Sequence, residues 1–178
     1  METKIGEFIV RTVLDEEPDD DPRDPDSWDN LGKMLFKHKN YNLPQETTDE
    51  ELKKARVVLP VYMLDHSGIT FSMEDFHDPW DSGLIGYIAA FDDDIRRYFE
   101  VKRITSKVIE MTKQRLAQEV QDYDQFVRGE IYGFEVVKKN EDGEEEIVDS
   151  CYGYYGEEDA MIDGKDSARC MSEATSEA

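Results

Sequence analysis

Residues 57–91, VVLPVYMLDHSGITFSMEDFHDPWDSGLIGYIAAF, include the longest apolar runs of the chain. Residues 57–64 are typical of a strand, the dipeptide Ser67-Gly68 of a turn, and residues 69–73 of a second strand, so a hairpin is predicted. Residues 84–91 are almost continuously apolar, which favours a strand buried on both faces. This stretch therefore predicts the centre of an antiparallel sheet.

The flanking segments add further elements of both kinds. Residues 5–14 are rich in β-branched and aromatic side chains and predict an opening strand. A capping-box pattern predicts a short helix at 49–56. Apolar residues at helical spacing predict one long amphipathic helix over 105–127. The Asp-Gly turn between 130–139 and 145–151 predicts a second hairpin.

These patterns predict an α+β fold, in which an antiparallel sheet is packed by one long amphipathic helix. The length of 178 residues suits one domain, which we place at 1–164. It would contain an acidic loop at 15–29, followed by a short helical turn near Trp28. The acidic, small-residue-rich end at 165–178 is expected to be a disordered tail.

The net charge of −22 is concentrated in two segments. Residues 15–29 contain nine acids and one arginine, and residues 141–164 contain ten acids and no base, whereas the region 96–115 is net basic. A salt-adapted source would spread its acids more evenly, and we keep it as the minor explanation. Because this field repels phosphate, direct nucleic-acid binding is not expected, and a basic partner protein is favoured, such as one that itself binds nucleic acid.

The cellular setting follows from what the chain lacks. Its apolar runs are far shorter than the roughly 18–20 residues of a membrane span, and its N-terminus has no signal-peptide pattern. Cys151 and Cys170 form neither a disulfide framework nor a zinc motif. We therefore expect a cytoplasmic protein with no membrane partner and no cofactor.

A group of histidines and carboxylates in the central stretch is the first candidate for chemistry. His66, His77, Asp78 and Asp81 are ligand types for a divalent cation, if the hairpin brings them together. Their spacing matches no specific metal motif, and the same residues are typical of polar turns. Turn formation is the favoured interpretation, and metal binding is the alternative.

Thiol catalysis is the second candidate. Cys151 as nucleophile, His66 as base and either Asp65 or Asp149 as the orienting carboxylate would supply its minimal parts. However, the acids near Cys151 would raise the pKa of its thiol and weaken the nucleophile. A cysteine packed in the core is the favoured alternative.

Partner binding is the third candidate, and it rests on exposed acids and an aromatic ring. Tryptophan and tyrosine are enriched at protein interfaces, and carboxylates suit a basic partner. The candidate partner-binding residues are Asp19, Asp20, Asp21, Asp24, Asp26, Trp80, Glu144, Glu145 and Glu146.

Four motifs in sequence order carry a resemblance to known proteins. They are LPVYMLDHSG at 59–68, PWDSG-x-x-GYI at 79–88, YDQFVRGEIYGF at 123–134 and VDSCYGYYG at 148–156. In these motifs, which span roughly residues 27–156, the chain resembles a group of small proteins of tailed phages and integrated mobile elements. No established activity attaches to that group, so the resemblance implies a prokaryotic host cell and no mechanism.

Charge and resemblance together suggest an acidic phage accessory protein that acts through protein–protein interaction. One version is an inhibitor of a basic, nucleic-acid-binding host defence factor. The alternative is a small metal- or thiol-dependent enzyme that uses the region of His66, His77 and Cys151.

Overall fold

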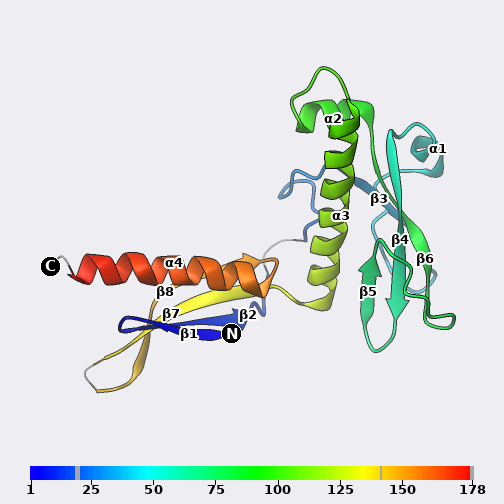
Figure 1. The fold of residues 1–178 in the computed structure, drawn as a ribbon. Helices are drawn as coiled ribbons and strands as arrows, with labels where there is room; N and C mark the ends of the chain where they lie inside the picture. The colour runs from blue at the N-terminus through cyan, green and yellow to red at the C-terminus, as the bar shows by residue number, and fades with distance from the viewer. Residues whose placement is uncertain (19–20, 141, 177–178) are drawn as a thin grey trace. The chain divides into compact units, whose positions relative to one another are not determined.

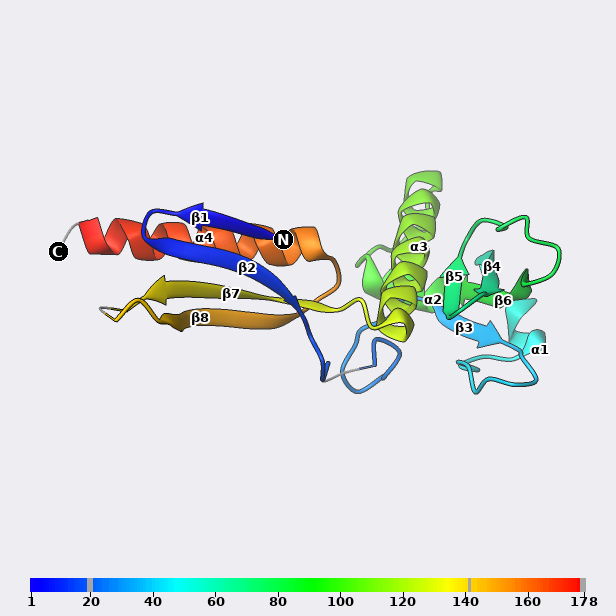
Figure 2. The same cartoon turned by 90° about the horizontal axis from the view of Figure 1, so that it is seen from below.

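The computed structural model describes residues 1–18, 21–140 and 142–176 (Figure 1). The chain forms two compact units, one from Met1–Asp19 with Gly129–Ala178 and the other from Asp20–Arg128. Over the described residues each unit contains a four-stranded antiparallel sheet and a long helix, so the fold is α+β (Figures 1 and 2). We expected one sheet and one long helix in a single domain, whereas the described residues form two sheets and two long helices, distributed over two compact units.

The first unit is built on the sheet β1-β2-β7-β8. Its strands are β1 (Glu2–Ile5), β2 (Phe8–Leu14), β7 (Tyr132–Lys139) and β8 (Glu145–Tyr154). β2 and β7 are direct antiparallel partners, although the whole sequence of the second unit lies between them. The predicted hairpin near residues 140–143 is confirmed as β7 and β8.

Helix α4 (Glu157–Ser176) lies along one face of this sheet (Figure 2). Its Met161 and Ala168 are buried against Phe8, Val10 and other apolar residues of β2 and β7. The helix approaches closely at Gly164, where an added Cβ would lie 2.7 Å from a methyl group of Val10. The prediction of a disordered tail from residue 165 is therefore wrong for residues 165–176, because a sheet face stabilises this helix.

The second unit is built on the sheet β3-β6-β4-β5. Its strands are β3 (Lys33–Phe36), β4 (Val57–Asp65), β5 (Ile69–Ser72) and β6 (Ser82–Ala90). β4 and β5 form the predicted hairpin, and β6 pairs with β4 on its other side. β3 replaces the helical turn expected after Trp28. β6 is not buried on both faces, because Leu84 is 51% exposed and Tyr87 37%.

Among its described residues, 21–128, the second unit also contains the helices α1 (Asp49–Leu52), α2 (Asp92–Tyr98) and α3 (Ser106–Arg128). Thr48 and Glu51 form the predicted capping box of α1. Helix α3 buries Leu116, Val120 and Tyr123 in the core cluster that contains the inward side chains of the sheet. α3 also holds the outer edge of β5, since the buried Asp124 carboxylate accepts the Phe71 N–H at 2.6 Å.

The part of the acidic segment that the structure describes in this unit, from residue 21 onward, is tied to the core by its single base. Arg23 has a side chain only 5% exposed, and it donates to Glu119 of α3 at 3.1 Å, to Glu46 at 2.8 Å and to the Gly32 carbonyl at 2.7 Å. Burial alone would lower the pKa of Arg23, but the two carboxylates outweigh it and raise the pKa. This part of the predicted acidic loop is therefore anchored by a buried side chain.

Candidate functional site

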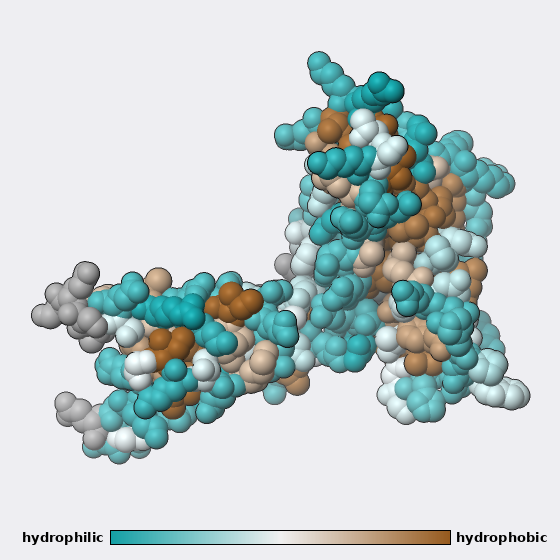
Figure 3. Space-filling view, viewed as in Figure 1, coloured by the Kyte–Doolittle hydropathy of each residue, from teal (hydrophilic) through white to brown (hydrophobic). Residues whose placement is uncertain are grey.

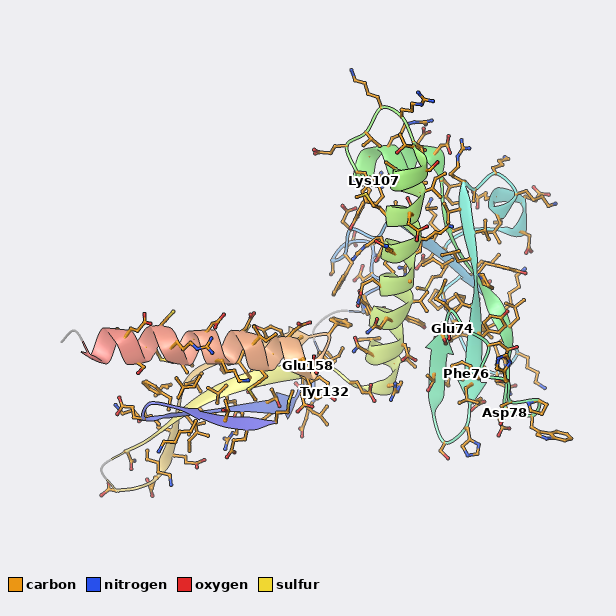
Figure 4. All side chains as sticks on the ribbon, viewed as in Figure 1. Glu74, Phe76, Asp78, Lys107, Tyr132 and Glu158 are labelled. Atoms are coloured by element: carbon orange, nitrogen blue, oxygen red, sulfur yellow. The ribbon has the colours of Figure 1, made fainter. Side chains whose placement is uncertain are left out.

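The loop between β5 and β6 holds Trp80 at the surface. The Asp78 carboxylate accepts the N–H groups of Trp80 at 2.8 Å and Asp81 at 2.9 Å, and the Ser82 hydroxyl donates to the Asp78 carbonyl at 2.7 Å. Hydrogen bonds from Asp81 and Trp80 lower the pKa of the Asp78 carboxyl. The loop is thus internally bonded, while the Trp80 side chain is 90% exposed. Figure 4 labels Glu74, Phe76 and Asp78 along it.

The turn between β4 and β5 is bonded to this loop. His66 Nδ1 lies 2.9 Å from Asp81 Oδ2, and the Asp65 N–H donates to the Asp81 carbonyl at 2.8 Å. The hydrogen bond and the charge of Asp81 raise the pKa of the exposed His66 imidazole. Asp65, His66, Trp80 and Asp81, all predicted site residues, therefore come together.

Tyr41 and His38, which the sequence did not predict as site residues, also lie at this turn. The Tyr41 hydroxyl donates to Asp65 Oδ2 at 2.7 Å, and the His38 ring stacks on Tyr41 with 4.9 Å between ring centroids. The bond to Asp65 raises the pKa of the Tyr41 hydroxyl. Both residues lie in the connection after β3, and no local pattern there predicts contact with the β4–β5 turn.

A pocket of about 320 Å³ lies beside His38, Asp65 and Asp81. Its lining includes Asp65, Trp80 and Asp81, with apolar walls from Met63, Leu84 and other residues of β4 and β6. Met63 is buried at 6% exposure, whereas Leu84 continues onto the outer surface. The pocket therefore combines an aromatic ring, carboxylates and an apolar wall.

Leu84 connects the pocket to an apolar area on the outer face of the sheet. Tyr87 of β6 and Val58 of β4 are exposed there, beside the half-buried Pro60. Figure 3 shows hydrophobic residues at the surface over the strands of this unit. An exposed apolar area next to a polar rim is typical of a protein-binding surface.

The proposed metal ligands do not all converge. His66 and Asp81 are in contact, but the exposed His77 lies 3.7 Å from Asp75, and Asp78 is engaged in the turn that holds Trp80. Across residues 1–18, 21–140 and 142–176, no group of three or more histidine, cysteine, aspartate or glutamate side chains is arranged to hold a metal ion.

Cys151 lies on β8 of the first unit with an exposed side chain. The expectation of a core cysteine is wrong at this position. All three histidines of the chain, including His66, belong to the second unit, so Cys151 has no imidazole within its own unit. The Cys151 Sγ lies 3.8 Å from the Tyr152 carbonyl oxygen.

The predicted acidic residues fall into both units. Asp21, Asp24 and Asp26 lie in turns around Arg23, where Asp24 Oδ1 accepts the Asp26 N–H at 2.9 Å. Asp19 and Asp20 lie outside the described residues. At the β7–β8 hairpin Glu144, Glu145 and Glu146 are exposed, and Glu145 pairs with Arg11 at 3.1 Å.

A larger pocket, of about 470 Å³, adjoins the anchored segment and is lined by Arg23, Trp28, Lys33, Arg97 and other residues. Two of its cations already have carboxylate partners, since Arg97 pairs with Asp94 at 3.2 Å and Arg23 with two glutamates. Although this pocket is larger than the one beside Trp80, the ion pairs of Arg23 and Arg97 leave it with no charge that favours a particular class of ligand.

A comparison of this chain with protein-family models, curated protein sequences and solved structures finds no match in any of the three. No helix among the described residues is long and apolar enough to cross a membrane.

Proposed function

We propose that this chain is a protein-interaction module whose Trp80 surface engages a basic partner protein. The observation that carries the proposal is a tryptophan side chain 90% exposed on a loop held by its own hydrogen bonds. Tryptophan, like tyrosine and arginine, is enriched among the residues that dominate binding energy. A loop that is already ordered loses less conformational entropy when it binds.

The charge of the surface supports a basic partner. Residues 73–82 contain four acids and no base, in a chain of net charge −22. Such a field speeds association with positively charged surfaces and repels polyphosphates. Direct nucleic-acid binding is accordingly not part of the proposal.

The resemblance to proteins of phages and mobile elements supports a prokaryotic host as the setting. Within it, we propose that the partner is a host protein that binds nucleic acid, such as a defence factor, which is inhibited when carboxylates occupy its phosphate-binding surface. Phosphate mimicry requires acids at fixed positions. The anchoring of the segment around Asp24 and Asp26 by the buried Arg23 supports this version.

Affinity capture from host lysate tests the proposal with three variants of the full chain. Trp80→Ala removes the proposed anchor, and Asp24→Asn with Asp26→Asn removes charge while keeping side-chain oxygens that accept hydrogen bonds. Ile162→Ala, at an exposed position of α4, is the matched control. Captured proteins are identified by mass spectrometry, and the binding of each purified one is then measured directly.

We expect basic proteins to bind the wild type and Ile162→Ala equally. Trp80→Ala should lose at least about tenfold in affinity. Binding of the wild type should also weaken as salt rises from about 0.1 to 0.5 M, because exposed charges are then screened. An affinity that changes neither in Trp80→Ala nor with the salt concentration would exclude the proposal.

The contact of His66 with Asp81 supports a second candidate, a small enzyme with His66 as general base. A carboxylate on Nδ1 leaves Nε2 free to accept a proton, as in hydrolases that use a histidine base. Elemental analysis of the purified protein and of His66→Ala tests the metal-dependent form. Stoichiometric metal that is lost in His66→Ala would favour the enzyme over the interaction module.

A further inference from the structure

We infer that the pocket beside Trp80 binds the guanidinium group of an arginine side chain supplied by the partner. This inference rests on the proposed function and adds to it the chemical group that is recognised. It comes from three properties of the pocket: its aromatic ring, its apolar wall and the free oxygens of its two carboxylates.

The aromatic ring and the apolar wall suit the two parts of an arginine side chain. A guanidinium stacks on an indole through its charge and its flat shape, and tryptophan is the best aromatic partner for a cation. Trp80 has almost its whole surface available for such a contact. The methylene stem of the arginine would cover Met63 and Leu84, which line the same pocket.

The carboxylates supply the acceptors. Asp65 accepts Tyr41 through Oδ2, and Asp81 contacts His66 through Oδ2. Among the described residues neither Oδ1 atom has a hydrogen-bond partner. Two such oxygens in a pocket that Trp80 also lines match a planar group with several N–H donors better than an ammonium, which acts as a point charge.

Three basic side chains of the chain itself, Lys37, His38 and His66, line the pocket or contact its carboxylates. Lys37 lines the pocket, but its ammonium is paired with Asp49 of α1. His66 occupies one oxygen of Asp81 and leaves Asp65 without a charged partner among the described residues. The pocket therefore keeps at least one carboxylate that an incoming cation can neutralise.

The test uses the full chain labelled with ¹⁵N and two small probes, N-acetyl-arginine amide and N-acetyl-lysine amide. The two tryptophan indole signals are assigned with Trp80→Phe, and the probes are titrated while the Trp80 indole and the amides of Leu84 and Ile85 are followed. We expect saturable shifts with the arginine probe, at an affinity about fivefold or more above that of the lysine probe.

Asp65→Asn should reduce the affinity for the arginine probe about three- to tenfold, because it removes a charged acceptor. The control is Asp93→Asn, which removes one negative charge from an almost fully exposed position of α2 in the same unit. It should leave the affinity unchanged. Equal binding of both probes, or an equal loss in both variants, would mean that the attraction is only general electrostatics and would overturn the inference.

The outcome is separable from that of the proposed function. Partner binding that depends on Trp80 without any arginine preference rejects the arginine pocket and keeps the interaction module. Arginine binding at the pocket without any Trp80-dependent partner keeps the ligand class and rejects the module.

Discussion

Replacing Glu119 by glutamine removes an acceptor on which four donors converge. Oε1 accepts the Leu31 N–H at 2.8 Å and Arg115 Nε at 3.1 Å, while Oε2 accepts the Gly32 N–H at 3.0 Å and Arg23 Nη1 at 3.1 Å. The side chain is only 1% exposed, so water cannot replace a lost partner. Burial raises the pKa of this carboxyl, and the N–H donors and Arg23 lower it in part.

The magnitude follows from the number of donors left without an acceptor. A glutamine oxygen can accept about two of the four hydrogen bonds, and its NH₂ group would face the remaining donors. A buried donor without a partner costs about 1–3 kcal/mol. Breaking a buried ion pair by removing one partner costs about 3–5 kcal/mol. We therefore expect Glu119→Gln to lower the free energy of unfolding of the second unit by about 3–5 kcal/mol.

Urea denaturation followed by Trp28 fluorescence measures this loss, since Trp28 belongs to the segment that Arg23 anchors. A Trp80→Phe background makes Trp28 the single tryptophan of the chain. Glu110→Gln, at an exposed position of the same helix, is the matched control and should change stability by less than about 0.5 kcal/mol. A loss below about 1 kcal/mol in Glu119→Gln would refute the role assigned to this carboxylate.

Three further predictions concern the second unit. Asp81→Asn should lower the pKa of His66 in an NMR titration, because the hydrogen bond and the charge of Asp81 raise that pKa in the wild type, and an unchanged pKa would contradict this. The His66–Asp81 pair therefore stabilises the fold fully below the pKa of an unfolded histidine, and this stabilisation is lost as the pH rises through the folded pKa of His66. Asp78→Ala should increase the ¹⁵N mobility of residues 79–81, and an equally rigid loop would show that the Asp78 hydrogen bonds do not order it. Gly86→Ala should lower the free energy of unfolding in urea by about 1–3 kcal/mol, since its Cβ would lie 2.0 Å from a backbone oxygen of β3. Gly83→Ala, whose Cβ would meet no atom within 4 Å, should lower it less, and equal losses of stability in the two variants would argue against close packing of β6 on β3.

The elements that could be predicted are those whose pattern is local. The helical spacing of apolar residues led to α3, the capping box to α1, and the Asp-Gly turn to the β7–β8 hairpin. In each case the residues that specify the element lie within a few turns or one loop of each other. The α+β class followed from the same signals.

The candidate site was predictable in part for the same reason. His66, Trp80 and Asp81 lie in the turns at the two ends of one short stretch of sequence, so their closeness in space could be expected from the predicted hairpin. Tyr41 and His38 reach the site from another part of the chain, and no sequence period connects them with Asp65.

The remaining features depend on contacts between residues far apart in sequence. By itself the sequence determined the charge, the central hairpin and the position of the long amphipathic helix α3, because these depend on neighbouring residues. Only the tertiary structure decided that the chain forms two units, since β2 pairs with β7 although the whole second unit separates these strands in the sequence. It also decided that Arg23 is an anchor, because a single base in an acidic run acquires that role only where the buried Glu119 meets it.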